Sequence, residues 1–409
     1  MKEGDKRIMR DLFAKCGEEG GYFSYLRMQR DRYFTLPILE GMPGPHMVFQ
    51  GRKVIQWAIN NYLGLVGRPE LIETAREAAA RWGVGAPMGS RFMTGNTERH
   101  TELERRLARF SAKESAILFN YGYLGVIGTI TSMIGKDDVI VIDKLAHASM
   151  MDAAFATRQF IPFRHNDMVS LERALRRASR DREGGVLVVV EGVYGMTGDL
   201  ADLPGIVELK NKYGARLFVD DAHGFGTMGK GGGGIGFHYG LQDEIDIYFG
   251  TFAKAFAAIG GFSSADDTVV EYIRYNARTQ IFAKSLPMVV VEVLIKAIDI
   301  VESEPKLVEK LWENARKLQN GLRELGFDLG NTASPVTPVY IPAADLETAI
   351  RFIHKMRDEK GIFVSGVMYP VVPKGVLLCR MIPTAAHTEE DIEITLKAFR
   401  EVRDEMKLW

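Results

Sequence analysis

The chain has 409 residues, 52 of them basic and 53 acidic, so its formal net charge is −1 when the histidines are neutral. With this balance we expect no basic surface that would bind nucleic acid and no polybasic patch that would bind a membrane. Two cysteines, Cys16 and Cys379, are too few for a disulfide framework and favour a reducing compartment. No apolar run reaches the roughly 18 residues that span a bilayer, and the charged start MKEGDKRIMRD lacks the apolar core of a signal peptide. We therefore expect a cytoplasmic protein without a transmembrane segment, which recognises its substrate locally.

The first 50 residues predict an arm that lies on the body of the protein or on a partner. Residues 21–32 are polar and rich in aromatic residues, as in a helix, whereas LPILEGMPGPH contains too much proline and glycine for regular structure. VFQGRKVIQWAI then predicts a hairpin around Gly51. Residues 69–82 form an amphipathic pattern that opens with proline, which predicts a helix.

SAILFNYGYLGVIGTITSMIG predicts a buried strand that runs through Gly122 into an apolar helix. The N-terminus of a helix offers free backbone N–H groups and a partial positive charge, which together suit a phosphate. Gly122 and Tyr123 are therefore candidates for a phosphate cradle.

The stretch from Arg216 to Gly261 carries the strongest chemical signal. One β-branched and aromatic run ends at Asp220 with His223 close behind, and a second run ends in a loop that holds Lys254. In a parallel α/β sheet such strand ends converge on one ligand. Pyridoxal 5'-phosphate uses this set of groups, because its aldehyde takes a lysine as a Schiff base and its pyridine nitrogen needs a carboxylate to stay protonated. Taken one at a time, these residues are more often surface charges or turn formers.

The same region has two other interpretations, a dinucleotide site and a metal site. Residues 224–229 spell GxGxxG after a predicted strand, but the glycines that follow leave no helix N-terminus for a dinucleotide pyrophosphate. A metal could be imagined among four side chains, although they form no tight ligand motif: Asp143, His147, Asp220 and His223. Both interpretations are weaker than the pyridoxal phosphate one.

His147 follows a predicted strand over residues 138–143. An imidazole in that place can stack on a pyridine ring and exchange protons near neutral pH, although an isolated histidine there is more often structural. VLVVVE is an uninterrupted apolar run, which is typical of a strand buried on both faces by helices.

Four segments, VDDAHGFGTMG, GTFAKAF, KLAHASMMDAA and EGVYGMTGDL, resemble the α-oxoamine synthase family of fold-type I pyridoxal phosphate enzymes, and the resemblance covers nearly the whole chain. It implies an α/β fold, with a mainly parallel seven-stranded sheet in a large domain and a small α+β C-terminal domain. It also implies a decarboxylative condensation of an amino acid with an acyl thioester. We expect an N-terminal arm and hairpin over 1–55, a large domain over 56–295 and a small domain over 296–409.

The resemblance also assigns roles to individual residues. Lys254 would carry the cofactor and remove the Cα proton, Asp220 would face the pyridine nitrogen, His223 would donate to the phenolic oxygen, and His147 would stack on the ring. Thr251 would contact the cofactor as well.

Other matched segments imply the substrate site. NNYLGL places Asn60 near the substrate carboxylate, and LLCRMIPTAAHT places Arg380 there, where a guanidinium among apolar neighbours needs an anionic partner. The glycine-rich loop over 83–100 would line the active site near the subunit boundary, which makes Ser90 and His100 substrate-side candidates.

IFAKSLP resembles a stretch that reaches the phosphate of the partner subunit, so Ser285 is a cofactor candidate and a homodimer with shared active sites is expected. The chain departs from the family pattern at five residues near the cofactor: Val126, Gly195, Thr197, Ala283 and Lys284. The family usually has a serine close to the cofactor at position 195, so Gly195 implies a hydrogen bond that is lost or taken over by water or a neighbour. These departures keep open a non-catalytic scaffold, as an alternative from a different class of protein.

Within the family, HND, YNARTQIF and TAAHT resemble most the bacterial serine palmitoyltransferases. That resemblance implies L-serine and a long-chain acyl-CoA, or the acyl carrier protein thioester, and a 3-keto amine product at the first step of sphingolipid synthesis. Alternatives with the same chemistry are the cysteate acyltransferase of sulfonolipid synthesis, 2-amino-3-ketobutyrate CoA ligase and 8-amino-7-oxononanoate synthase.

Overall fold

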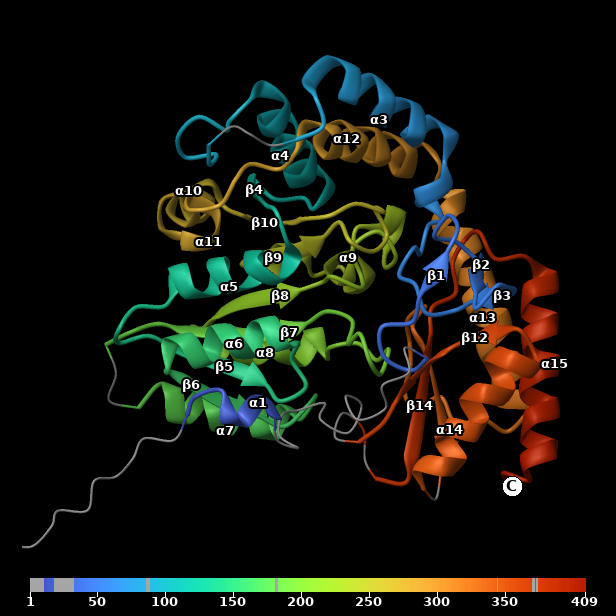
Figure 1. Ribbon diagram of the computed structural model, residues 1–409. Helices are drawn as coiled ribbons and strands as arrows, with labels where there is room; N and C mark the ends of the chain where they lie inside the picture. The colour runs from blue at the N-terminus through green and yellow to red at the C-terminus, as the bar shows by residue number, and fades with distance from the viewer. Residues whose placement is uncertain are drawn as a thin grey trace, which may run out of the picture.

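The computed structural model describes residues 11–17, 33–85, 89–180, 183–343, 345–369, 372 and 374–409. It shows a large α/β body with a smaller domain packed beside it (Figure 1). The helix expected over residues 21–32 lies outside the described residues.

The large body is built on a seven-stranded sheet in the order β4-β10-β9-β8-β7-β5-β6. Strand β10 runs antiparallel to both of its neighbours, and the other neighbouring pairs are parallel. The mainly parallel seven-stranded sheet predicted from the sequence is therefore confirmed. The strands are β4 (Ser115–Phe119), β5 (Val139–Asp143), β6 (Phe160–Phe163), β7 (Val186–Glu191), β8 (Arg216–Asp220), β9 (Ile247–Thr251) and β10 (Gly261–Ala265).

Helices cover both faces of this sheet, as the apolar run of β7 predicted. Along β7, Val188 and Val190 face one hydrophobic core while Leu187 and Val189 face another. The first core includes buried side chains of α3 (Pro69–Trp82), α4 (Glu98–Phe110), α7 (Met168–Ala178), α8 (Leu203–Tyr213) and α12 (Met288–Ser303). The second includes those of α5 (Gly122–Met133), α6 (Ala148–Thr157) and α10 (Asp267–Asn276).

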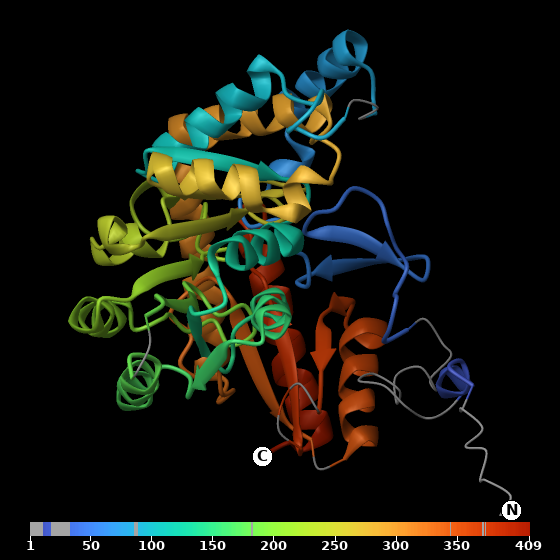
Figure 2. The same cartoon turned by 90° about the vertical axis from the view of Figure 1, so that its left-hand side faces the viewer.

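The small domain shares its core with the N-terminal hairpin. Strands β2 (His46–Phe49) and β3 (Arg52–Gln56) form the predicted hairpin, and β3 pairs in parallel with β12 (Ile362–Phe363). Phe49, Val54 and Trp57 pack with the small-domain side chains. Figure 2, turned by 90°, shows the hairpin beside the C-terminal strands and helices. The remaining elements here are β11 (Thr337–Pro342), β13 (Ser365–Val367), β14 (Val376–Met381), α14 (Leu346–His354), the π-helix Lys355–Glu359 and α15 (Glu389–Met406).

One segment differs in detail from expectation, and one connection is made of two helices. The proline- and glycine-rich stretch before the hairpin holds a short strand, β1 (Leu39–Glu40), which pairs with β2, so the prediction of no regular structure there was wrong for two residues. The connection between the domains is two helices, α12 and α13 (Lys306–Glu324), separated at Pro305. Leu311 of α13 packs in the large core and Leu318 in the small one.

The last helix, α15, begins with a capping box. The hydroxyl of Thr388 accepts from the backbone N–H of Asp391, and the Asp391 carboxylate accepts from the N–H of Thr388. This capping box satisfies two N–H groups that lack partners within the helix. The capping box fixes where the polypeptide turns after β14, close to the site described below.

Candidate active site

The candidate site lies where the parallel strands of the large sheet end. Glu191, the last residue of β7, is paired in register with Asp220, the last residue of β8, and Asp220 is next to Phe249 of β9. Strand β9 ends two residues later at Thr251. Carboxyl ends of neighbouring parallel strands form the usual ligand crevice of such sheets. Two carboxylates and a hydroxyl therefore meet at one edge.

Lys254 follows β9 and is partly buried beside these carboxylates. Loss of water around the amine lowers the pKa of Lys254 to about 8, although the negative charges of Asp220 and Glu191 act to raise it. A pKa near 8 leaves a useful fraction of the amine neutral at physiological pH, which is what a nucleophilic or basic lysine needs.

Asp220 and Glu191 form a buried acidic pair. Burial raises the pKa of Asp220, and the charge of Lys254 opposes that rise. Burial, with the nearby charge of Asp220, raises the pKa of Glu191 to about 8. The Asp220 carboxylate accepts from the Ala222 N–H at 3.1 Å, and the Glu191 carboxylate accepts from the Gly195 N–H at 3.1 Å. Raised carboxyl pKa values next to an amine with a lowered pKa are characteristic of a catalytic cluster.

His147 caps the N-terminus of α6. Its Nδ1 lies 2.8 Å from the hydroxyl of Ser149 and accepts from the backbone N–H of the same residue. The ring keeps an accessible face, and Tyr123 packs edge-on against it at 6.0 Å between centroids. Partial burial lowers the pKa of His147, so the imidazole is mainly neutral near pH 7.

His223 is buried between two residues from other segments. Its Nδ1 lies 2.8 Å from the hydroxyl of Tyr62. On the other side, a Cβ placed on Gly195 would lie 2.3 Å from Nε2. Burial, and then the positive charges of Lys254 and Arg380, hold the pKa of His223 well below its usual range. The ring is therefore a neutral imidazole in a fixed position.

The start of α5 fits a phosphate. Gly122 is its first residue, and a Cβ there would lie 2.8 Å from the hydroxyl of Thr251, so a side chain would fill the space between the helix and β9. Its N-cap residue, Tyr121, makes no side-chain capping hydrogen bond. Free N–H groups, a glycine-lined space, a lysine and a carboxylate together fit pyridoxal phosphate. Tyr123 donates its hydroxyl to Asp152, so only its backbone remains for the cradle.

Arg380 and Asn60 come together from β14 and from the segment after the hairpin. Arg380 donates to the Gly195 carbonyl at 2.9 Å, and its other terminal nitrogen lies 3.5 Å from Oδ1 of Asn60. Two backbone hydrogen bonds, from Ile382 to Trp57 and from Ala385 to Tyr62, tie these segments together. Among the described residues no acidic side chain pairs with Arg380, as expected if its anionic partner is a substrate.

The loop candidates lie further from this cluster. His100 is fully buried, with Nε2 at 2.9 Å from the Leu286 carbonyl and Nδ1 at 2.8 Å from the Thr97 hydroxyl. Both ring nitrogens are therefore engaged in holding α4, so the expectation that His100 lines the site has no support from its position. Arg91 forms a buried bidentate pair with Glu104 rather than binding a free anion.

Ser90 and Ser285 differ in exposure. Ser90 is partly buried, and its carbonyl accepts from the N–H groups of Met93 and Gly95, which shapes the loop. Ser285 is buried within its own chain, whereas Lys284 beside it is exposed. Of the departures from the family pattern, Val126 is a buried residue of α5 that packs in the core on that face of the sheet.

The glycine-rich loop after His223 surrounds a buried carboxylate rather than a nucleotide. Asp221 accepts from the N–H of Ile235 at 2.7 Å and from the hydroxyl of Tyr248 at 3.0 Å. A Cβ on Gly192, Gly224 or Gly234 would come within 2.3 Å of this carboxylate. The glycines are thus explained by close packing on Asp221. The expectation that no helix follows was wrong in detail, because a 3-10 turn (Lys230–Gly232) and the five-residue α9 (Ile235–Tyr239) are present, but neither is a long helix of the kind that binds a dinucleotide pyrophosphate.

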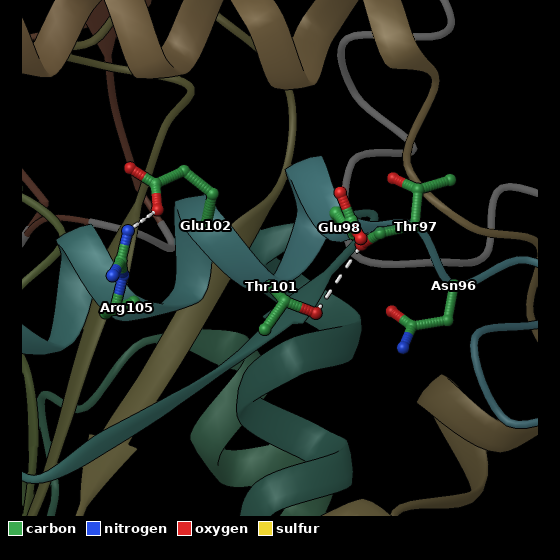
Figure 3. A pocket seen from close by; sticks show the side chains of 6 residues that line it. All are labelled: Asn96, Thr97, Glu98, Thr101, Glu102 and Arg105. Carbon is green, nitrogen blue, oxygen red and sulfur yellow. Dashed lines mark hydrogen bonds and ion pairs between the residues drawn. The ribbon is translucent and has the colours of Figure 1, made fainter.

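A separate surface pocket of about 510 Å³ lies at the start of α4 (Figure 3). None of the individually predicted site residues lines it, although its first three residues belong to the loop over 83–100 that was expected to line the active site: Asn96, Thr97, Glu98, Thr101, Glu102 and Arg105. Within the described part of the chain, no cluster of three or more His, Cys, Asp or Glu could hold a metal. Nor is any helix of that part long and apolar enough to cross a membrane.

A model of class I and II aminotransferases matches residues 52–399. The chain belongs to this aminotransferase family. Its relatives include a cysteate-C-fatty acyltransferase of Capnocytophaga ochracea, 47% identical over 98% of this chain and 96% of the relative. An 8-amino-7-oxononanoate synthase of Thermoanaerobacter pseudethanolicus is 39% identical over 92% of this chain and 94% of the relative. A serine palmitoyltransferase of Sphingobacterium spiritivorum is 36% identical over 96% and 98%.

Solved structures agree with this family. A serine palmitoyltransferase variant from S. paucimobilis, with bound pyridoxal phosphate and myriocin, has a TM-score of 0.89 and 31% identity, covering 98% of this chain and all of that one. The fold-type I assignment, the pyridoxal phosphate cofactor and a pyridoxal-phosphate-dependent acyltransferase of the α-oxoamine synthase kind are confirmed.

Two residues of the cluster were missed by the sequence reasoning. Glu191 ends a strand next to Asp220, so the argument that singled out Asp220 applied to Glu191 as well. Tyr62 is part of the quoted NNYLGL segment, yet no local pattern indicated that its hydroxyl meets His223, which is 161 residues away in the chain.

Proposed function

We propose that this protein condenses L-cysteate with a long-chain fatty acyl thioester, with loss of carbon dioxide. The observation that supports cysteate is the 47% identity, over nearly all of both chains, to the Capnocytophaga ochracea cysteate-C-fatty acyltransferase. The serine palmitoyltransferase of Sphingobacterium spiritivorum is 36% identical over a similar span. The sequence motifs favoured L-serine, which becomes the second candidate and is supported by the TM-score of 0.89 to a solved serine palmitoyltransferase.

Pyridoxal phosphate supplies an aldehyde that takes up amino groups and a ring that accepts the electron pair released at the amino acid's Cα. The protein's own groups do the rest. Lys254, with its pKa lowered to about 8, has the neutral amine needed to attack the aldehyde and to remove the Cα proton. The charge of Lys254 opposes the rise that burial causes in the pKa of Asp220, and as a carboxylate this residue would keep a proton at the pyridine nitrogen.

Three further side chains orient the reactants. Arg380, whose guanidinium donates to the Gly195 carbonyl, binds the α-carboxylate of the amino acid substrate together with Asn60. His147 would stack on the ring and, as a neutral imidazole, could hold or release a proton next to the reacting carbon. A hydrophobic chain on the second substrate is consistent with the relatives named for fatty acyl transfer.

The test is a substrate comparison with the purified, cofactor-loaded protein. Cysteate, serine, glycine and alanine are each titrated while the visible absorbance is followed, and each is then incubated with acyl-CoA of graded chain length. Cysteate should give the largest spectral change at the lowest concentration and a sulfonate-containing keto amine by mass spectrometry. Turnover with serine and none with cysteate would replace the first candidate by the second, and turnover with pimeloyl thioester and alanine would indicate 8-amino-7-oxononanoate synthesis.

We also propose a homodimer in the cytoplasm. The support is the family resemblance of residues 281–287, in which Lys284 is exposed and its carbonyl accepts from the side-chain amide of Asn120, just before α5. Light scattering and activity measured over the same dilution series would test it. A fully active monomer would contradict the shared active site.

A further inference from the structure

His223 is held from two sides by residues to which the family motifs assign no role toward it. On one side is the Tyr62 hydroxyl, 2.8 Å from Nδ1. On the other is the bare Cα of Gly195, where the family pattern has a serine. Both contacts fix the same ring, so the question is which ring nitrogen they leave free for the cofactor.

The hydrogen-bond partners of Tyr62 and His223 show which ring nitrogen is free. The Tyr62 side chain is fully buried, and burial raises the pKa of its phenol, so the hydroxyl keeps its proton. Among the described residues this hydroxyl has no partner other than His223. If Nδ1 donated to the Tyr62 oxygen, the buried O–H would be left without an acceptor, which costs about 1 to 3 kcal/mol. Tyr62 therefore donates to Nδ1, and a neutral His223 carries its proton on Nε2.

Gly195 decides where that Nε2–H lies. A Cβ at this position would lie 2.3 Å from Nε2 and 2.6 Å from Cδ2, so the ring occupies the volume that a side chain would need. Nε2 itself has no hydrogen-bond partner within the described part of the chain. The N–H is thus available to a ligand at the strand ends.

We propose that Tyr62 and Gly195 are positioning residues: Tyr62 sets the Nε2–H tautomer of His223, and Gly195 gives the ring the room to present that proton to the phenolic oxygen of pyridoxal phosphate. The second clause rests on the proposed role of His223, whereas the tautomer can be measured without any substrate. Failure of the substrate assignment would therefore leave this proposal standing.

The first experiment is nitrogen NMR of histidine-labelled, cofactor-loaded protein, with His223→Asn used to assign the signal. In the unmodified chain, His223 should show a protonated Nε2 and a hydrogen-bonded, unprotonated Nδ1. In Tyr62→Phe, which keeps the ring but removes the donor, the Nδ1–H form should become populated. A His223 protonated on Nδ1 in the unmodified chain would overturn the proposal.

The second experiment is a cycle of variants read by the dissociation constant of pyridoxal phosphate. Tyr62→Phe should weaken cofactor binding about 3- to 10-fold, the loss expected for one hydrogen bond, and should have no effect in the His223→Asn background. Equal weakening in both backgrounds would mean that Tyr62 does not act through His223.

Gly195→Ala should displace the ring and weaken cofactor binding by a similar factor. Two matched controls should leave the dissociation constant unchanged. Tyr248→Phe removes a buried hydroxyl that donates to Asp221, and Gly321→Ala creates an equally close contact, 2.4 Å from Leu396, in the small domain. Normal cofactor binding and an unmoved His223 in Gly195→Ala would refute the role of the glycine.

Discussion

Arg380 donates to the backbone carbonyl of Gly195 at 2.9 Å, a hydrogen bond that joins strand β14 of the small domain to the turn after β7 of the large sheet. The same turn donates the Gly195 N–H to Glu191 and packs against His223. Arg380, on the substrate side, and His223, on the cofactor side, therefore both contact Gly195. A shift of the small domain would move both relative to the strand ends.

Arg380→Ala should weaken amino acid binding. Loss of a charge-assisted pair with a carboxylate costs about 2 kcal/mol, or roughly 30-fold in the dissociation constant. Arg380→Lys should recover only part of this loss, because an ammonium cannot reproduce the two-pronged contact. The measurement is titration of the visible absorbance with the best amino acid substrate.

The control for this pair is Arg400→Ala, on the exposed face of α15, which should leave amino acid binding unchanged. Cofactor content should stay normal in both Arg380 variants, because the phosphate cradle lies at α5. If Arg380→Ala binds the amino acid as tightly as the unmodified protein does, another group reads the carboxylate.

Lys254→Ala should abolish turnover and prevent borohydride from attaching the cofactor to the chain. In the unmodified protein, capture of added pyridoxal phosphate should speed up with pH, because the pKa of Lys254 is about 8 and the neutral amine reacts. The rate should rise about tenfold per pH unit well below pH 8 and level off above it. Stopped-flow absorbance at several pH values measures this profile, and labelling of a different lysine would refute the assignment.

Asp220→Asn should fold normally and lose most activity. An amide of the same shape fills the site but cannot hold a proton at the pyridine nitrogen. Circular dichroism would check the fold and a turnover assay the activity. Near-normal turnover would show that the carboxylate is not needed for the electron sink.

The large sheet could be predicted because its strands are marked by local patterns. VLVVVE and the runs that end at Asp220 and Thr251 are apolar on both faces, and polar residues follow directly, so both the strand and its functional end could be inferred from the sequence. The capping box of Thr388 and Asp391 is equally local. Such signals depend on neighbours within a few residues, which the sequence displays.

Contacts across long chain separations could not be predicted in the same way. His100 matched a family position, but its burial against Leu286 depends on the packing of α4 beside the segment before α12. Tyr62 is held near His223 by contacts far apart in the chain: β3 pairs with β12, and backbone hydrogen bonds join the segment after β3 to the segment after β14. Gly195 looked like the loss of a hydrogen bond, whereas its missing side chain provides the space for an imidazole.

Glu191→Gln should stabilise the cofactor-free protein increasingly as the pH rises. Burial raises the pKa of Glu191 to about 8 in the folded chain, whereas an unfolded glutamate titrates near 4.3. The folded state therefore binds this proton more tightly, and the stability linked to it is fully present below about pH 4.3 and is lost as the pH rises towards about 8. Glutamine does not titrate, and its side-chain oxygen can still accept from the Gly195 N–H. The difference in melting temperature between Glu191→Gln and the unmodified chain should grow from pH 5 to pH 8 and then stay constant.

The control is Glu208→Gln, on an exposed face of α8, which should show no such trend. A difference that is the same at every pH would mean that the Glu191 carboxyl ionises at its usual pKa in the folded protein. Burial and the charge of Asp220 would then not raise its pKa.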